Sequence, residues 1–458
     1  MAPVPRSSLS MARCFRLAVL LVLAAAPGPV VGQSAAKEPA GCNAWPAWRG
    51  AHGDGVATGC KLPDSWPEQP LPVVWDAPLE KGWSSPVVAD GRVFVSDRRL
   101  DVERLQAFDA QTGRQLWQLK HPVDFDPHPV GRRHGNGPKS TPVVAGGRVY
   151  WLGIAGWLEC VDARDGTSQW HLDLPAEFGR HQPLASNRAF VDREEAVIVP
   201  VGKGEGAAVP LFGYTGSPRV DDGRLICPIG QPGAGTFAAL DVATGRMLWH
   251  ALDEHVSYSS PIIVELAGVR QVVAMTGPRV VGLACKDGGL LWSHPFQIQY
   301  DESISTPVVS DDMVIVSGEG HPTTALKISA DGAGQSATMV WENFDLTSYL
   351  SSMLAYGGHI YGMNDGGELC CVRASDGKTL WSGGKHGYYC TPLLADGKLL
   401  CLNERGTLLV VAADPGGYRV LGESQLTDAA TWTTPALVGQ QLFIRSADGL
   451  RCLSLARP

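Results

Sequence analysis

Short apolar runs separated by Asp-Gly or Gly-Gly turns recur along most of the chain. One unit, residues 84–119, contains SSPVVADGRVFV and then LQAFDAQTGRQLWQL. The openings of later units read STPVVAGGRVYWL, GSPRVDDGRLICPI, STPVVSDDMVIVS, SSMLAYGGHIYGM and CTPLLADGKLLCL. Asp-Gly and Gly-Gly are typical of tight hairpin turns, because glycine tolerates positive φ. The pattern therefore predicts a repeated unit of short antiparallel strands.

Each unit opens on an anchor position that is proline or, once, methionine. The anchors are separated by 56, 76, 43, 46, 46, 39 and 43 residues. A period of about 40 to 45 residues with four short strands is typical of a propeller blade. We therefore expect an all-β, eight-bladed β-propeller of four-stranded antiparallel blades, with strands A to D in each blade. The anchors are Pro86, Pro142, Pro218, Pro261, Pro307, Met353, Pro392 and Pro435.

Strand D of most units ends in tryptophan. In five units a glycine of the turn between strands C and D precedes that tryptophan by four residues. The fifth unit stretches the interval, from Gly332 to Trp341, and the seventh has Val420 and Leu421 where tryptophan would fall. The five glycines are Gly113, Gly166, Gly245, Gly288 and Gly377, and their tryptophans are Trp117, Trp170, Trp249, Trp292 and Trp381.

The two ends of the repeat are complementary. The last unit, Thr433 to Leu455, has strands A, B and C but no strand D. Near the start, Leu71 to Leu79 reads LPVVWDAPL, a lone strand D. A closed ring leaves no free sheet edge, so we expect Val73 to Trp75 to complete the final blade. The predicted organisation is a signal peptide over 1–32, an N-terminal extension over 33–69 and the propeller over 70–458.

The N-terminus resembles a secretory signal. Arg13 and Arg16 precede an apolar run from Leu17 to Ala26, followed by Pro27, Gly28 and Gly32. A run of this length is too short to span a bilayer, which needs roughly 20 residues. We expect a periplasmic or secreted protein with no transmembrane segment in the mature chain. The alternative reading of this run is a buried helix.

Composition narrows the function classes. The 458 residues carry a formal net charge of −8 with both signs mixed, which gives no basic face for nucleic acid. Cys42 and Cys60 flank a Gly-rich segment, so a disulfide between them is possible. The spacing of the cysteines and histidines does not match a zinc site. Seven cysteines in apolar runs are expected to be buried: Cys160, Cys227, Cys285, Cys370, Cys371, Cys401 and Cys452.

The repeat resembles that of pyrroloquinoline-quinone-like (PQQ-like) propellers. The resemblance lies in the pattern AxDAxTGxxxW of Ala107 to Trp117 and, loosely, Ala239 to Trp249. Two further segments, WPAWRGAHGDGVA (45–57) and HGNGPKSTPVV (134–144), are similar to segments of exported bacterial members. The superfamily includes quinoprotein alcohol dehydrogenases and BamB-type assembly scaffolds. The resemblance is therefore specific for the fold and much less so for the activity.

Two long insertions are expected on one rim. They are residues 120–138 and 175–212, both loops from strand D to the next strand A in neighbouring blades. D to A and B to C loops should share one face. Long loops on rigid scaffolds often bind ligands, so this basic rim is a candidate site for an anionic ligand or partner; the alternative is surface decoration. Its polar residues are His121, His128, Arg132, Arg133, His134, Asn136, Arg180, His181, Arg188 and Arg193.

A second candidate site is the mouth of the channel. Six of the eight units carry an aromatic residue shortly before the strand A anchor. Such residues would ring the channel, where flat ligands could stack on them; the alternative is packing between blades. The six are Trp83, Tyr214, Tyr258, Tyr349, Tyr389 and Trp432.

The chain offers little evidence of catalysis. A quinoprotein dehydrogenase needs a carboxylate base, and calcium held by carboxylate and amide oxygens. Asn364-Asp365 and Asn403-Glu404 occupy equivalent turns, which favours an ordinary turn. Adjacent Cys370 and Cys371 lie in a strand C run and are read as packing residues rather than a vicinal disulfide. The oxygen candidates are Asp97, Asp101, Glu319, Asn364, Asp365, Asn403 and Glu404.

The preferred interpretation is a non-catalytic, monomeric platform that binds a protein partner, a small molecule or a glycan. No catalytic or metal-binding residue is assigned. The main alternative is a dehydrogenase that uses PQQ and calcium to oxidise an alcohol or a sugar. The second alternative is a glycan-binding module.

Overall fold

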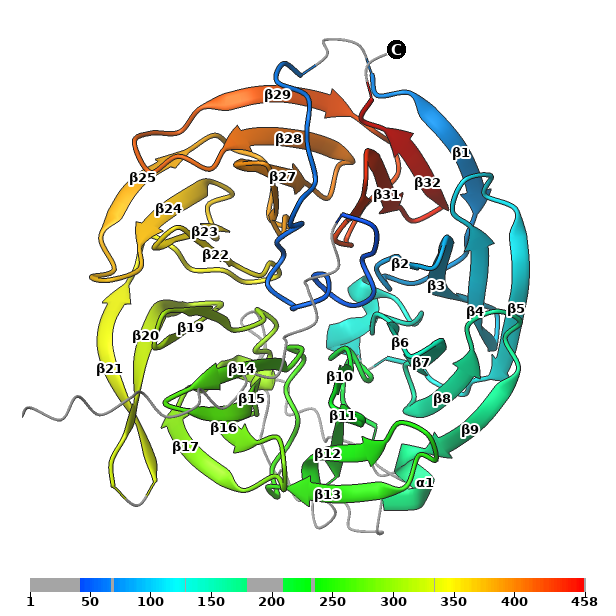
Figure 1. The fold of residues 1–458 in the computed structure, drawn as a ribbon, viewed down its shortest axis with the longest axis horizontal. Coiled ribbons are helices and arrows are strands. Elements are labelled where there is room, and N and C mark those ends of the chain that lie inside the picture. Colours follow the sequence, from blue (N-terminus) through cyan, green and yellow to red (C-terminus); the bar gives the residue numbers. More distant parts are fainter. Residues whose placement is uncertain are drawn as a thin grey trace, which may run out of the picture. The chain divides into compact units, whose positions relative to one another are not determined.

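The protein folds as a ring of eight four-stranded antiparallel sheets (Figure 1). The computed structural model describes residues 42–66, 70–127, 129–178, 209–231, 235–332 and 334–456, all within one compact unit, Ala40–Pro458. The predicted eight-bladed propeller is confirmed. The predicted signal peptide lies outside the described residues. No helix in the described ranges is both long and apolar enough to cross a membrane.

The first four blades follow one another along the chain. Blade 1 contains β2 (Val87–Ala89), β3 (Arg92–Arg99), β4 (Val102–Asp109) and β5 (Gln115–Pro122). Blade 2 contains β6 (Val143–Ala145), β7 (Arg148–Leu152), β8 (Trp157–Asp162) and β9 (Ser168–Asp173). Blade 3 contains β10 (Arg219–Asp221), β11 (Arg224–Gln231), β12 (Gly235–Asp241) and β13 (Met247–Ala251). Blade 4 contains β14 (Ile262–Leu266), β15 (Val269–Met275), β16 (Arg279–Ala284) and β17 (Leu290–Pro295).

The remaining blades complete the ring. Blade 5 contains β18 (Val308–Ser310), β19 (Met313–Gly318), β20 (His321–Ala330) and β21 (Gln335–Asn343). Blade 6 contains β22 (Leu354–Tyr356), β23 (His359–Met363), β24 (Leu369–Arg373) and β25 (Thr379–Gly383). Blade 7 contains β26 (Leu393–Ala395), β27 (Lys398–Leu402), β28 (Thr407–Ala412) and β29 (Val420–Gln425). Blade 8 contains β30 (Ala436–Val438), β31 (Gln441–Arg445), β32 (Gly449–Ser454) and β1 (Val73–Pro78).

Helices are short and lie in the connections. Those among the described residues are α1 (Leu174–Phe178) and two 3-10 segments, η1 (Pro129–His134) and η2 (Gln299–Asp301). Within each blade strand A faces the centre and strand D lies at the perimeter (Figure 1).

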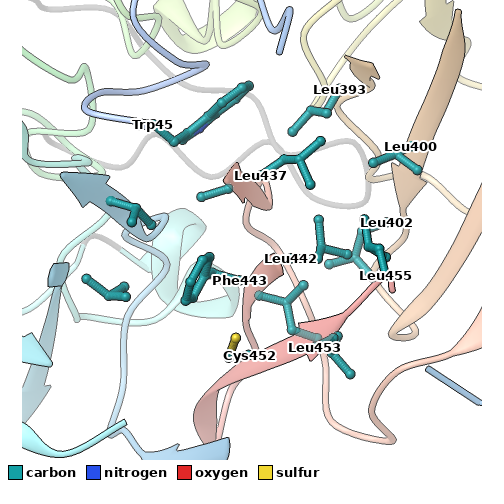
Figure 2. Close-up of a cluster of buried hydrophobic side chains, with 14 of the residues drawn as sticks. Trp45, Leu393, Leu400, Leu402, Leu437, Leu442, Phe443, Cys452, Leu453 and Leu455 are labelled. Carbon is teal, nitrogen blue, oxygen red and sulfur yellow. The ribbon is translucent and has the colours of Figure 1, made fainter. Parts of the chain in front are cut away.

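The predicted closing strand is confirmed. β1 pairs antiparallel with β32, with Trp75 opposite Cys452 and Pro78 opposite Gly449, so the strand runs three residues beyond Trp75. The apolar cluster around this blade joins blades 7, 8 and 1 with the N-terminal segment, and Figure 2 shows Trp45, Phe443 and Leu453 within it. Closure thus buries both faces of the last blade.

The glycine and tryptophan of the repeat meet across blade boundaries. A Cβ on Gly113 would lie 2.6 Å from Trp75, and one on Gly166 would lie 2.7 Å from Trp117, each a tryptophan of the preceding blade. The same indoles donate Nε1–H to a carbonyl of the next blade, at Ala110 (3.0 Å) and Ala163 (3.2 Å). The repeat therefore encodes the contact between successive blades. The same hydrogen bond joins Trp170 to Val242, Trp249 to Cys285, Trp341 to Ala374 and Trp381 to Asp414.

The two irregular units use different contacts. Blade 5 lacks the short turn that would receive Trp292, which instead donates to Gln271 Oε1; Gln271 Nε2 then donates to Gln335 Oε1 of blade 5 at 3.1 Å. Blade 7 lacks a tryptophan in strand D. Trp66 of the N-terminal segment packs there, with its Cβ 2.2 Å from where a Cβ on Gly422 would be and its Nε1 donating to Ser424.

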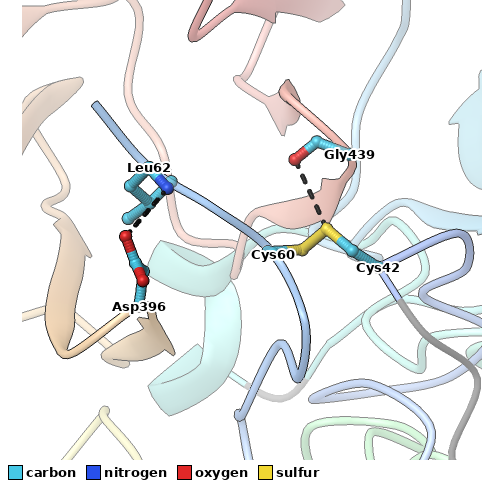
Figure 3. Close-up of a disulfide and its surroundings, with 5 residues drawn as sticks. All are labelled: Cys42, Cys60, Leu62, Asp396 and Gly439. Atoms are coloured by element: carbon cyan, nitrogen blue, oxygen red, sulfur yellow. Dashed lines mark hydrogen bonds between the residues drawn. A yellow bond between two sulfur atoms is a disulfide. The ribbon is translucent and has the colours of Figure 1, made fainter. Parts of the chain in front are cut away.

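A disulfide ties down the N-terminal segment. Cys42 and Cys60 are bonded with a Cα–Cα distance of 4.8 Å, so the possible pairing is confirmed (Figure 3). Leu62 N, just beyond it, donates to Asp396 Oδ2 in the A to B turn of blade 7. The seven cysteines expected in apolar strands are all buried.

Candidate functional site: the central cavity

The segment Trp45–Ala57, here called the plug, crosses one end of the central channel. Its backbone adds hydrogen bonds to strand A of three blades: Trp45 pairs with Val88, Pro46 O accepts from Val144 N, and Gly55 and Ala57 pair with Leu394. In Figure 1 the segment lies over the middle of the ring. From the sequence, residues 33–69 were predicted only to be an N-terminal extension. The strands that pair with the plug lie far away along the chain, so the pairing could not be predicted.

Two buried arginines fasten the plug. Arg49 donates to Met353 O of blade 6, and Arg219 of blade 3 donates to the carbonyls of Trp48, Gly50 and Ala51. Burial disfavours the charged guanidinium and lowers the pKa of both arginines to about 10. Because many blades hold the plug, the channel is closed at this end.

On the other side of the plug lies a cavity of about 880 Å³, including its open mouth. Trp48 of the plug is at its floor, where Nε1 donates to Thr306 Oγ1 at 3.1 Å. The walls come from residues that precede strand A, so the mouth opens on the face of the D to A loops. The aromatic lining consists of Trp48, Trp83, Phe212, Tyr258, Tyr389 and Trp432.

Four of the six predicted mouth aromatics line this cavity. Trp83 stacks on Trp432 with ring centroids 5.4 Å apart, and Trp432 lies parallel to Tyr389 at 6.4 Å. Tyr258 lines the opposite wall, edge-on to Phe212.

Tyr214 and Tyr349 do not belong to that lining. Tyr214 is 1% exposed, sits in the apolar cluster of blades 2 and 3, and donates to Ile229 O. The expectation that it rings the channel is therefore wrong, because its side chain turns between two blades. Tyr349 contacts Glu302 at the cavity edge, where its hydroxyl donates to Glu302 Oε2 at 3.3 Å.

The two insertions meet on one face, as expected. Val209 of the second insertion packs with Val123 and Phe125 of the first and with Ile154 of a B to C turn. Lys139 Nζ donates to Phe212 O at 3.2 Å. D to A and B to C loops thus share a face, and this face carries the cavity mouth.

Nine of the ten predicted rim residues fall into three groups, and the tenth, His121, stacks on Trp157 with ring centroids 3.9 Å apart. His134 lies in the cavity wall, and Arg133 beside it donates to His134 Nε2 and to the Tyr349 hydroxyl. Arg132 is exposed, 4.0 Å from Asp126, and the backbone oxygen of Asn136 accepts from Arg98. His181 lies outside the described residues, as do His128, Arg180, Arg188 and Arg193.

Sequence reasoning missed an ionisable residue of the wall, Lys139, and the carboxyl of Glu103 behind it. Lys139 donates to Gly135 O and Phe212 O, and burial lowers its pKa to about 8 while Glu103 behind it opposes the shift. Glu103 is fully buried, accepts from Ile154 N, and has its pKa raised to about 7 by burial. Lys139 lies in the HGNGPKSTPVV motif, which was the available signal; Glu103 lies inside β4, where no signal distinguishes it.

Glu302 is the other missed residue. It lines the cavity at 6% exposure, and burial raises the pKa of its carboxyl to about 7, opposed by the hydrogen bond from Tyr349. Burial, with the nearby cations Arg133 and Lys139, lowers the pKa of His134 to about 4, so its imidazole is neutral at pH 7. Groups with such shifted pKa values are common at functional sites.

A belt of hydroxyls lies between the aromatic mouth and the floor. The residue before each anchor is serine or threonine. In six of the eight pairs of neighbouring blades, the side-chain oxygen of this residue accepts a hydrogen bond from the backbone N–H of the equivalent residue in the preceding blade, at 2.9–3.1 Å. The belt thus links the blades around the channel. Its members are Ser85, Thr141, Ser217, Ser260, Thr306, Ser352, Thr391 and Thr434.

The cavity lining does not fit a calcium-bound quinone. Calcium takes six to eight oxygens, largely from carboxylates and amides, but among the described lining residues Glu302 is the single carboxylate and none is an amide. Asp97 is instead paired with Arg104 and with Glu80 N. Asn364 and Asn403 cap equivalent turns by accepting from Glu368 N and Thr407 N, which confirms the turn reading.

A closed ring of eight blades, with a glycine–tryptophan contact between blades and an N-terminal closing strand, defines a PQQ-like β-propeller protein. The family model described as outer membrane protein assembly factor BamB matches residues 72–133 and 123–383, more than half of the chain. The chain therefore belongs to that family.

Relatives support the same family at low identity. BamB of Burkholderia pseudomallei is 25% identical over 371 residues, which is 73% of this chain and 86% of that protein. BamB of Yersinia pestis is 22% identical over 69% of this chain and 81% of its own length. The crystal structure of BamB from Moraxella catarrhalis superimposes with a TM-score of 0.55 at 13% identity, covering 84% of this chain and 97% of that one, which shows the shared fold.

Similarity to dehydrogenases is more limited in extent. A quinohemoprotein alcohol dehydrogenase of Pseudomonas putida is 26% identical over 171 residues, 36% of this chain but 19% of the enzyme. The chain thus spans about a fifth of the length of that enzyme.

Proposed function

We propose that this protein is an exported, non-catalytic binding platform for a protein partner in outer membrane protein assembly. The support that carries the proposal is the extent of the match, because the relatives matched over 81% and 86% of their own length are both assembly factors. The pattern of Arg13, Arg16 and the apolar run that follows, which is typical of a secretory signal, agrees with export.

The chemistry of the cavity is also consistent with binding. The plug lies across one end of the channel, so we expect a group to enter through the aromatic mouth on the D to A face. Aromatic residues supply large contact areas at interfaces and are enriched in binding hot spots. The charged groups of the wall are already paired with protein atoms: Lys139 with two carbonyls and Glu302 with Tyr349.

Site-specific photocrosslinking tests the platform. A photoreactive residue replaces Arg132 on the D to A face or Asp90 in an A to B turn on the opposite face, both exposed. Each protein is irradiated with cell-envelope extract of the organism that the sequence comes from. We expect the Arg132 position to crosslink a component of outer membrane protein assembly more strongly than the Asp90 position does. Absence of any such adduct from either position would refute the proposal.

A quinone-dependent dehydrogenase remains the alternative, favoured by the partial similarity to such enzymes and by the near-neutral pKa of the Glu302 carboxyl. Purified protein is mixed with PQQ and calcium, and a shift of quinone absorbance and dye reduction with alcohols and aldoses are measured. Stoichiometric binding with turnover would establish this alternative. A glycan-binding module, the second alternative, would be retained on polysaccharide resin.

A further inference from the structure

Five residues of the belt line the cavity, and three of them are serines whose oxygens each accept one backbone N–H. Ser217, Ser260 and Ser352 line the cavity and are 2%, 5% and 3% exposed. Their oxygens accept from the backbone N–H of Thr141, Ser217 and Thr306, at 3.0, 2.9 and 3.0 Å. These bonds fix each oxygen at a defined position on the wall.

The protons of these hydroxyls are free for a ligand. A serine hydroxyl has one proton to donate, and none of the three donates to a protein atom within the described ranges. A buried donor without an acceptor costs about 1–3 kcal/mol. The cavity therefore presents a set of O–H donors that a ligand rich in acceptors would satisfy.

The charged groups of the wall do not compete for such a ligand. Lys139 donates to Gly135 O and Phe212 O, Glu302 accepts from Tyr349, and Arg133 donates to the same tyrosine hydroxyl. The rest of the lining offers aromatic surface near the mouth and hydroxyl protons below it. A neutral ligand with carbonyl oxygens matches both.

We propose that the cavity takes a neutral peptide segment of the protein partner, with an aromatic or large apolar side chain against Trp83 and Trp432. The carbonyl oxygens that flank this side chain accept from Ser217, Ser260 and Ser352. This inference rests on the proposed function, because it names what the partner inserts.

The probe is N-acetyl-phenylalaninamide, which carries one aromatic side chain between two peptide carbonyls. Binding to the full chain is measured by calorimetry and by tryptophan fluorescence. We expect affinity about tenfold above that for N-acetylglycinamide, which lacks the ring, and for N-acetyl-phenylalanine, which adds a carboxylate. Tighter binding of cellobiose or of PQQ with calcium than of the amide would overturn the inference.

Two belt serines provide a matched pair of variants. Ser260→Ala removes a cavity donor, whereas Ser85→Ala removes the equivalent bond between blades, from Thr434 N, at a residue that does not line the cavity. Ser260→Ala should weaken binding of the amide about fivefold, as expected for one neutral hydrogen bond, and Ser85→Ala should leave it unchanged. Equal effects of the two variants, or no effect of Ser260→Ala, would contradict a direct role of the hydroxyl.

Trp432→Ala separates this inference from the proposed function. If this variant still forms the Arg132 crosslink at the parental level, the partner binds outside the cavity, so the inference fails while the platform stands. If the parent forms no crosslink to an assembly component, the platform itself fails, whatever the amide does. Loss of both amide binding and the crosslink in Trp432→Ala, with melting behaviour like that of the parent, supports the inference.

Discussion

Replacing Trp75 with alanine should open the ring where its first and last strands meet. Trp75 is 7% exposed, contacts Phe443 at 6.0 Å between ring centroids, and donates to Ala110 O of blade 1. A buried tryptophan replaced by alanine costs about 3–5 kcal/mol, and an unpaired carbonyl adds about 1 kcal/mol. A loss of about 4–6 kcal/mol is a large part of the roughly 5–15 kcal/mol that stabilises a typical protein.

Two measurements test this prediction: urea unfolding at equilibrium, and hydrogen exchange of the folded protein read by mass spectrometry. The urea midpoint of Trp75→Ala should fall at nearly unchanged slope. Exchange should accelerate in β1 and in β32, because β1 covers the outer edge of β32 and is held there without chain continuity.

Trp249→Ala is the matched control. Trp249 is 8% exposed and makes the same bond to the next blade, at Cys285 O, but its strand β13 is continuous with β12. It should show a similar fall in midpoint while β32 stays protected. Unchanged exchange in β32 of Trp75→Ala, or a change in stability below about 0.5 kcal/mol, would refute the reasoning about closure.

Three further outcomes are expected. Gly166→Ala should lower the free energy of unfolding by more than Gly268→Ala does. Both glycines have a φ of 75°, but a Cβ on Gly166 would lie 2.7 Å from Trp117, whereas a Cβ on Gly268 would meet open space. The difference between the urea midpoints of the two variants checks this. The double variant Cys42→Ser with Cys60→Ser should lower the free energy of unfolding by about 3 kcal/mol, because it frees an 18-residue loop. It should also make the plug accessible to proteases. A plug that stays protected from proteolysis would contradict its dependence on the disulfide. Burial raises the pKa of the Glu103 carboxyl from 4.5 to about 7, so between these pH values the folded state holds a proton that the unfolded state has lost. The free energy of unfolding should therefore be highest below pH 4.5 and fall by about 3 kcal/mol as the pH rises to 7. In Glu103→Gln this part of the pH dependence of unfolding should disappear.

Much of the fold could be predicted from the sequence because the repeat is local. Hairpin turns, short apolar strands and a period of about 40 to 45 residues are all properties of neighbouring residues, and they specify a blade without reference to the others. The lone strand around Trp75 supplied the strand D that the last blade lacks, and from it the closed ring was correctly predicted. What the glycine–tryptophan spacing hid is that in most blades the tryptophan packs on the turn glycine of the next blade, such as Trp75 on Gly113.

The candidate site depended on tertiary structure. The aromatics before each anchor were visible as a group, yet the turn of Tyr214 between blades is decided by packing. The plug, with Trp48 at the floor of the cavity, depends on hydrogen bonds to strands far along the chain, such as Val88 and Leu394.

The sequence by itself determined the blade, the number of blades and the strand that closes them, because these follow from local patterns and from the absence of a free edge in a ring. Only the tertiary structure decided that the channel is closed at one end and that Lys139 and Glu302 share its wall. Their altered pKa values arise from burial, which depends on residues brought together by the closed ring.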